Sequence, residues 1–347
     1  MLISSLFSPK TASRGAGPMV LLTTLLLAGC DKDETPTFRA ATPPEVVAFS
    51  RINLYPEGVQ YDATGSRFLV SSQTAGDVGQ VADDGRYRVF AQDTRLVSSV
   101  GLYLDTDRLR DRLLVAVADP GYNLLGTSTA TKGKLARLAI FNRSNPQDAP
   151  TFIELGNVGT AASYPAHFAN DVAVDKDGNA YITDSFAPII YRVTPAGVAS
   201  VFAEDAQFAA PAGAFGLNGI VYHPSGYLLV AKSNTGTLFK IPVATPSAFT
   251  TVDVGSQNLT AADGLRLSDP STLQVVCNAQ AKVYRLSSTN GWASAAVSGS
   301  FNTPPLFPTT LARREGTDGF VLYSNLNALQ AGQSPPVSVF TLDRVRF

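Results

Sequence analysis

The chain has 347 residues, of which 45% are apolar and 16% are charged, and its formal net charge is −1. This composition is typical of a globular protein with a large core, and it excludes general disorder of the chain. A near-neutral chain also lacks the basic footprint of nucleic-acid-binding proteins, so we expect no nucleic acid partner.

The first thirty residues have the pattern of an export signal. Lys10 and Arg14 precede an apolar stretch, residues 19–27, that is too short to span a bilayer comfortably. The stretch ends in Leu-Ala-Gly-Cys at Cys30, which resembles a bacterial lipobox. We therefore predict a lipoprotein signal peptide over residues 1–29 and lipidation of Cys30. A plain signal peptide or a short anchor helix would show much of the same pattern.

The following residues, 30–43, are predicted to be a flexible tether because they are rich in Pro and Thr. The acidic and basic run at 31–34 looks like the surface-export signal of Bacteroidetes lipoproteins, and any short charged tether looks similar. We expect a monomer in the bacterial cell envelope, held on the outer membrane by its lipid anchor alone, on either the surface or the periplasmic face.

One phrase recurs along the rest of the chain. In residues 168–185, FANDVAVDKDGNAYITDS, two short apolar runs flank a turn that contains Gly178, as in a β-hairpin. Equivalent hairpins begin near Gly58, Gly101, Gly219 and Gly264. The units are spaced by roughly 43 to 48 residues, apart from one gap of about 70, and a four-stranded unit at this period indicates a β-propeller blade.

These repeats predict an all-β protein, a six-bladed β-propeller of four-stranded blades over residues 44–347. The long second unit carries an insertion at 121–134 that is rich in Gly, Ser and Thr. The first strand of the sixth unit, near 309–313, is degenerate, and its third strand is expected at 337–340. Residues 46–49 have no partner in the first unit, so we expect them to form the outer strand of the last blade and close the ring.

The innermost strand of a blade lines the central channel, so the residue that enters this strand lies at one mouth of the channel. In five units these residues are Glu57, Val100, Asn170, Asn218 and Asp263. Two carboxylates and two amides form a hard-oxygen set that suits Ca²⁺ better than Zn²⁺. The chain has only 2 histidines, which excludes a three-His zinc site. Asp or Asn before a strand also satisfies loop backbone groups, but four at one register favour a site.

The phrases PEGVQYD, ANDVAVDKDGNAYITDS, LNGIVYHPSGYLLVAKS and ADGLRLS resemble the gluconolactonase, senescence-marker-protein (regucalcin) and luciferin-regenerating-enzyme family of six-bladed propellers. The resemblance implies a single divalent ion, usually calcium, at the channel mouth. It assigns Glu57, Asn218 and Asp263 as metal ligands, with Asp263 also as acid/base. It makes Asn170 the substrate-side Asn, which we expect to contact the metal as well.

The chain departs from the family at two places. Sugar-lactone hydrolases of the family carry an Arg two positions before the Asn, where this chain has Phe168. The pair of active-site histidines of paraoxonase-like propellers is also absent, because His223 falls in an exposed-looking hairpin turn. His167 adjoins the proposed site and either carries protons or packs in the loop. Asp171 either contributes to the pocket or has a structural role.

Three further features have simple structural interpretations. The segment 175–179 resembles the start of an EF-hand, but its Gly stands at the fourth position instead of the sixth, so a hairpin turn is expected. Cys277 is expected to be a buried strand thiol. Trp292 is expected to pack in a blade core.

Two functions follow. The first is a calcium-dependent lactonase or esterase, in which Ca²⁺ polarises the carbonyl, Asp263 shuttles the proton and Asn170 orients the substrate. Its pocket would contain Phe168, His167 and Asp171, and its substrate would be a lactone or ester less polar than gluconolactone. The second is a propeller lipoprotein that binds a small molecule or a protein partner without turnover. The intact ligand set favours the first function, and the missing Arg favours the second.

Overall fold

The computed structural model describes residues 42–347. The predicted signal peptide (1–29), the lipidation site at Cys30 and nearly all of the tether (30–43) lie outside the described residues. The segment Pro43–Phe347 forms one compact unit. No helix found between residues 42 and 347 is long and apolar enough to cross a lipid bilayer.

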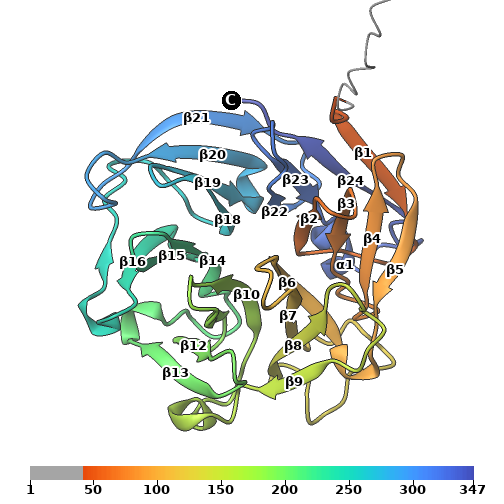
Figure 1. The fold of residues 1–347 in the computed structure, drawn as a ribbon, viewed down its shortest axis with the longest axis horizontal. Coiled ribbons are helices and arrows are strands. Elements are labelled where there is room, and N and C mark those ends of the chain that lie inside the picture. The colour runs from red at the N-terminus through yellow and green to blue at the C-terminus, as the bar shows by residue number, and fades with distance from the viewer. Residues whose placement is uncertain (1–41) are drawn as a thin grey trace, which may run out of the picture. The chain divides into compact units, whose positions relative to one another are not determined.

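The predicted six-bladed propeller is confirmed: the strands form six four-stranded sheets arranged in a ring (Figure 1). The first three blades contain β2 (Val59–Asp62), β3 (Arg67–Val70), β4 (Val78–Ala82) and β5 (Tyr87–Ala91); β6 (Ser98–Asp105), β7 (Arg112–Ala118), β8 (Ala136–Asn142) and β9 (Thr151–Glu154); and β10 (Ala169–Val174), β11 (Ala180–Asp184), β12 (Ile189–Val193) and β13 (Ala199–Glu204).

The next two blades contain β14 (Leu217–His223), β15 (Tyr227–Lys232), β16 (Thr237–Pro242) and β17 (Thr250–Thr251); and β18 (Ala262–Asp269), β19 (Thr272–Cys277), β20 (Lys282–Ser287) and β21 (Ala296–Asn302). The last blade contains β22 (Pro308–Ala312), β23 (Phe320–Tyr323), β24 (Val339–Arg344) and β1 (Val46–Ser50). One short helix, α1 (Leu326–Gln330), follows β23. Short 3₁₀ turns lie in the loops: η1 (Thr94–Leu96), η2 (Gly159–Ser163), η3 (Ala206–Phe208), η4 (Pro246–Ala248) and η5 (Asn278–Gln280).

Strand β1 closes the ring as predicted, because it pairs antiparallel with β24 at the outside of the last blade. Its inward residues, Val47 and Phe49, are buried, and the Phe49 ring lies 6.0 Å from that of Phe340. Strand β24 runs to Arg344, further than the expected 337–340, because Phe340 and Leu342 alternate inward between polar residues. Pairing of the first and last strands leaves no free sheet edge at the junction of the chain ends.

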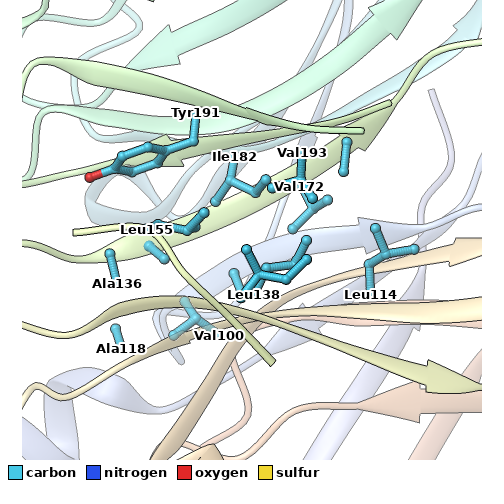
Figure 2. Packing of buried hydrophobic residues seen from close by; sticks show 14 of the residues in the cluster. Val100, Leu114, Ala118, Ala136, Leu138, Leu155, Val172, Ile182, Tyr191 and Val193 are labelled. Carbon is cyan, nitrogen blue, oxygen red and sulfur yellow. The ribbon is translucent and has the colours of Figure 1, made fainter. Parts of the chain in front are cut away.

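The apolar core lies between and within the blades rather than at the channel axis. Figure 2 shows one such cluster, in which Val100 and Leu114 from blade two pack near Val172, Ile182 and Tyr191 from blade three. Each blade presents both faces to its neighbours, which explains why its middle strands read as continuous apolar runs. Trp292 and Cys277 lie in another of these clusters, as expected, and both are fully buried.

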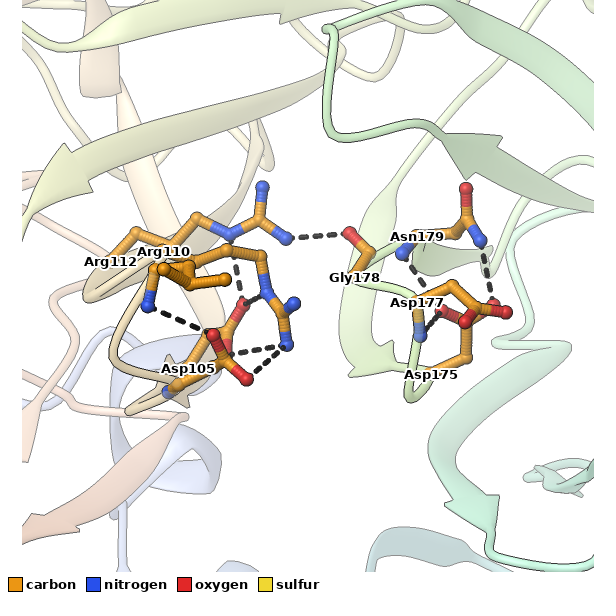
Figure 3. Close-up of polar contacts among 9 residues, drawn as sticks. Asp105, Arg110, Arg112, Asp175, Asp177, Gly178 and Asn179 are labelled. Atoms are coloured by element: carbon orange, nitrogen blue, oxygen red, sulfur yellow. Dashed lines mark hydrogen bonds and ion pairs between the residues drawn. The ribbon is translucent and has the colours of Figure 1, made fainter.

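Polar contacts tie neighbouring blades together where the innermost hairpins turn. Arg112 in blade two donates to the carbonyl oxygen of Gly178 in blade three at 2.6 Å (Figure 3). The same turn is stabilised by Asp175, whose carboxylate accepts the backbone N–H groups of Asp177 and Asn179, both at 2.9 Å. With Gly178 at φ 85°, the segment is the predicted hairpin turn.

His223 performs a similar role between blades four and five. The sequence pattern suggested an exposed turn, but the His223 side chain is buried and lies 2.8 Å from the carbonyl oxygen of Pro270. Its Nδ1 accepts the N–H of Ser225, so Nε2 donates to Pro270. The correction arises because the next blade covers the turn, and such coverage cannot be read from a single hairpin.

The innermost strands approach one another so closely that several positions require glycine. A Cβ atom at Gly219 would overlap the carbonyl oxygen of Asp263 in the next blade, and one at Gly101 would overlap that of Asn170. Gly58 and Gly264 face comparable obstacles across their own blade junctions. These glycines allow the six strands to surround a narrow axis.

We predict that Gly219→Ala destabilises the protein by about 1–3 kcal/mol, because the obstructing atoms belong to backbone that cannot rotate away. Denaturant unfolding followed by circular dichroism measures the change. Gly299→Ala on outer strand β21 is the matched control, since its Cβ would meet mainly side-chain atoms, 3.1 Å and 3.2 Å away. Equal stability losses in the two variants would contradict the proposed packing at the axis.

Candidate functional site

A cavity of about 570 Å³ opens at the end of the channel where the innermost strands begin. Glu57, Asn170, Asn218 and Asp263 all line it, although they come from blades one, three, four and five. Their exposed fractions are only 8%, 3%, 5% and 4%. The fold therefore brings together four oxygen-bearing side chains from positions that extend from Glu57 to Asp263 in the sequence.

A repeated β-bulge orients three of these side chains. In five innermost strands, two residues oppose a single residue of the second strand at the same register, as Asn170 and Asp171 do between the pairs Ala169↔Asp184 and Val172↔Ile182. In chain order, the first residue of the bulge in these five strands is Val100, Asn170, Asn218, Asp263 and Thr309. A bulge redirects side chains out of the normal alternation. The strands of Asn170, Asn218 and Asp263 consequently begin before these residues, whereas Glu57 precedes β2 as the sequence suggested and lies on no bulge.

The polar residues that support this ring also occur at a repeated position. In every blade, the residue immediately after the second strand is polar: Ser71, Asp119, Ser185, Ser233, Asn278 and Ser324. Ser71 Oγ accepts the backbone N–H groups of Glu57 and Gly58 at 3.0 Å and 2.7 Å. The sequence analysis missed this position, although the repeat alignment contains it.

Two of these supports fix the orientation of site residues. The Asn170 amide nitrogen donates to Ser185 Oγ at 2.9 Å, and Ser185 in turn donates to the carbonyl oxygen of Leu217 at 2.6 Å. The Asn278 amide nitrogen donates to one Asp263 oxygen at 2.8 Å. Each contact occupies one polar atom of the site residue and leaves another oxygen without a partner.

Five buried side-chain oxygens of cavity-lining residues have no hydrogen-bond partner within residues 42–347. Three belong to the candidate ligands, Asn170 Oδ1, Asn218 Oδ1 and Asp263 Oδ1, and the other two are Gln73 Oε1 and Asn234 Oδ1. Buried polar atoms are rarely left unpaired in proteins, and each one costs free energy. An unpaired set that lines one cavity is what a cation-binding site presents before its ion is bound. Clusters of three or more His, Cys, Asp or Glu in metal-binding geometry do not occur in this part of the chain, so any such site combines carboxylates with amides.

Three carboxylates near the axis are held in unfavourable surroundings. Burial raises the pKa of Asp263 to about 7, and the charge of Asp171 contributes to the rise. Burial also raises the pKa of Asp171 to about 7. The pKa of Glu57 lies well above its ordinary value because of burial and the charges of Asp263 and Asp171. No Lys or Arg charge is among the causes that act on these three groups.

Asp171 does not line the main cavity. It lines a small void of about 10 Å³ further along the channel, together with Glu57 and Asn218. Its carboxylate accepts the backbone N–H groups of Val172 and Ile220, at 2.9 Å and 3.1 Å, and so links blades three and four. The void is at the lower limit for holding one water molecule. Asp171 therefore adds negative charge beneath the site without entering it.

Phe168 and His167 are placed differently from each other. Phe168 lines the cavity, and its ring is 3% exposed. His167 is not among the lining residues; its Nδ1 lies 2.7 Å from Asp184 Oδ2 in a buried network. The cavity wall also includes Tyr122 from the insertion in blade two, which the sequence analysis did not assign to the site.

Searches of protein-family models and of curated proteins find no match to this sequence. Among solved structures, the chain is similar to the major allergen Mala s 1 of Malassezia sympodialis, with a TM-score of 0.66 and 18% identity over 88% of this chain and 97% of the allergen. It is also similar to a gluconolactonase of Xanthomonas campestris, with a TM-score of 0.58 and 14% identity over 86% and 89% of the two chains.

A third similar structure is virginiamycin B lyase from Staphylococcus aureus, with a TM-score of 0.54 and 12% identity over 87% of this chain and 99% of the lyase. The shared feature is the propeller fold. The expected likeness to gluconolactonase-type propellers is therefore present in the structure, at the level of the fold. Because an allergen, a lactonase and a lyase have the same fold, the activity has to be inferred from the site itself.

We predict that the metal-free protein becomes less stable as the pH rises through about 7. The folded-state pKa values of Asp171 and Asp263 are raised above their ordinary value of 3.8, so folding favours the protonated acids and this contribution disappears when they ionise. Each fully shifted group would account for up to about 4 kcal/mol between pH 4 and pH 7, and for about 3 kcal/mol of this above pH 5. The free energy of unfolding in urea, measured with EDTA at pH 5 and pH 8, gives the change.

Asp171→Asn should reduce this loss of stability between the two pH values, because one titrating group is removed. The exposed carboxylate variant Asp148→Asn is the control and should behave as wild type. A wild-type protein that is equally stable at both pH values would contradict the placement of the three carboxylates.

Proposed function

We propose that this protein is a calcium-dependent hydrolase of a lactone or ester, with one metal ion at the channel mouth held by Glu57, Asn170, Asn218 and Asp263. The observation that carries the proposal is the set of three unpartnered, buried oxygens of these candidate ligands, which line one cavity. Two carboxylates and two amide oxygens are the donors that Ca²⁺ prefers, and a flexible number of oxygen ligands suits its coordination.

The charge balance of the site supports a bound cation. Glu57 and Asp263 are buried and Asp171 is half-buried beside them, and an unpaired buried carboxylate is costly. A divalent ion would compensate two negative charges and would leave Asp171 to strengthen binding from below. A calcium ion bound here would polarise a substrate carbonyl and stabilise the developing oxyanion.

Asp263 and Asn170 would have different roles in hydrolysis. Asp263 is held through one oxygen by Asn278, and its other oxygen is free to accept a proton from an attacking water. For Asn170 the geometry favours the role of metal ligand over that of hydrogen-bond donor to the substrate. Its amide nitrogen is already used by Ser185, so the free atom is an acceptor oxygen.

The wall of the cavity favours a weakly polar substrate. No Arg, Lys or His is among the described residues that line it, and Phe168 stands where sugar-lactone hydrolases of the resembling family carry Arg. The gluconolactonase likeness is confined to the fold, so the lactone as substrate belongs to the proposal. The same Phe168 supports a second candidate, a propeller that binds a small molecule without turnover.

We predict that Asp263→Ala lowers hydrolysis of aliphatic and aromatic lactones and esters by about 100-fold or more, because it removes both a ligand and the proton acceptor. EDTA should reduce the wild-type activity to a similar level. The control is Asp84→Ala, which changes an exposed carboxylate that does not line the cavity. Unchanged hydrolysis in Asp263→Ala would refute the hydrolase proposal.

A thermal denaturation series with added calcium separates the two candidates further. A cation that binds only the folded protein must raise its melting temperature. A rise in wild type that is lost in Asp263→Ala supports the metal site even when no substrate is turned over. The absence of both the shift and hydrolysis would leave small-molecule binding without metal as the function.

Lipid anchoring at Cys30 remains a prediction, since this residue lies outside the described part of the chain. We expect wild-type protein expressed in a bacterium to fractionate with membranes, because several acyl chains on one residue anchor stably. Cys30→Ala should shift the protein to the soluble fraction. Equal partitioning of the two proteins, measured by immunoblotting of the fractions, would rule out the lipid anchor.

A further inference from the structure

Three phenylalanine rings form a triangular cluster at one side of the cavity. We define the aromatic cluster as Phe168, Phe186 and Phe215. The ring centroids of Phe168 and Phe215 are 5.2 Å apart with an interplanar angle of 88°, and Phe186 lies 5.4 Å from Phe168 and 5.3 Å from Phe215. The Phe168–Phe215 pair is edge-to-face, and the two pairs that involve Phe186 are tilted, at 55° and 44°.

Two of the three rings line the cavity. Phe168 is almost fully buried, whereas Phe215 is 36% exposed. Phe186 is not among the lining residues and packs against both others. The cluster therefore leaves part of its aromatic surface available to a ligand.

A single buried carboxylate forms hydrogen bonds with the backbone of two of the three cluster residues. Asp184 is fully buried, and its Oδ1 accepts the N–H groups of Phe168 and Phe186, at 2.8 Å and 3.0 Å. Its Oδ2 lies 2.7 Å from His167 Nδ1 and accepts the Tyr191 hydroxyl at 2.8 Å. Neither His167 nor Tyr191 lines the cavity, so this network supports the wall without reaching the reacting atoms.

The loop that carries Phe215 is fixed at its C-terminal end. Gly216 donates its N–H to the carbonyl oxygen of Ser185 at 2.8 Å, and Asn234 donates to that of Phe215 at 3.2 Å. All three rings are thus positioned before a ligand arrives. Preorganised walls of this kind lower the ordering cost of binding.

The cavity has both polar and apolar lining. The oxygens of the channel mouth share it with the aromatic cluster and with Tyr122, Phe307 and Leu326, and amide and hydroxyl side chains such as Gln73 and Ser233 also line it. Its volume of about 570 Å³ is in the range of small-molecule sites. A ligand that fills it should combine a carbonyl group with an apolar group.

We propose that the aromatic cluster is the subsite for an aromatic ring of the substrate, which makes the substrate an aryl-bearing lactone or ester, and that Asp184 is its positioning residue. The inference rests on the proposed function, since that function places the carbonyl at the oxygen side. An aromatic ring would add an edge-to-face or offset-stacked contact with the half-exposed Phe215 ring, which a saturated ring of equal size cannot do.

Binding of inert ketones tests the subsite without turnover. We compare cyclopentanone with its phenyl- and cyclohexyl-substituted forms by isothermal titration calorimetry at millimolar calcium. Wild-type protein should bind the phenyl ketone roughly two- to tenfold more tightly than the cyclohexyl ketone. Phe215→Leu should abolish this preference, because the replacement keeps an apolar surface but removes the ring. Phe152→Leu, on outer strand β9, is the matched control and should retain it.

The role of Asp184 is tested with the same ligands. Asp184→Asn should weaken binding of the phenyl ketone and leave that of unsubstituted cyclopentanone unchanged, a split that a general loss of structure would not produce. Tyr191→Phe removes only one hydroxyl from the same network and should show the same split with a smaller effect. An equal loss for both ketones in Tyr191→Phe would refute the positioning role.

The outcomes distinguish this inference from the proposed function. Equal binding of the phenyl and cyclohexyl ketones to wild type, or a preference that survives in Phe215→Leu, overturns the subsite even if lactones are hydrolysed. A phenyl preference that is lost in Phe215→Leu supports the subsite even if hydrolysis is never observed.

Discussion

The close approach of six innermost strands around one axis is the constraint on which the rest of the structure depends. Where the strands are nearest, a Cβ atom at Gly101 or Gly219 would overlap backbone of the next blade. Side chains are therefore excluded from most of the narrow ring. Asp171 is accommodated there because the backbone N–H groups of Val172 and Ile220 satisfy its carboxylate. Asn170, Asn218 and Asp263 are the first residues of the bulges in their strands and line the main cavity.

This arrangement gathers carboxylates without cationic partners and unpartnered amide oxygens at one mouth of the channel. Blade cores of the kind shown in Figure 2 provide large apolar burial, so the fold can tolerate the cost of carboxylates without cationic partners. Contacts such as the one from Arg112 to Gly178 lie at the opposite ends of the same strands, where Asp175 also accepts backbone N–H groups of the turn. The unpartnered oxygens that gather in one cavity favour a binding site there.

Two consecutive residues organise the two sides of the cavity. Asp184 ends β11 and holds Phe168 and Phe186 through their backbone, while Ser185 follows it and fixes the amide of Asn170. The unpartnered oxygen of Asn170 and two rings of the aromatic cluster are thus positioned by neighbouring residues at one strand end. A substrate that spans the cavity would contact both the Asn170 oxygen and the aromatic cluster. The residues that select the substrate are thus linked through the backbone to those that would orient its reacting group.

The sequence by itself determined the blade period, the closure of the ring by residues 46–49, and the shared register of Glu57, Asn170, Asn218 and Asp263. These features depend on alternation and turn chemistry, which are local and repeat with the blades. Only the tertiary structure decided that bulges aim three of these side chains, that His167 and His223 are buried in supporting contacts, and that Phe215 completes an aromatic wall. Such features arise from contacts between blades, and no single repeat contains the information about what packs against it.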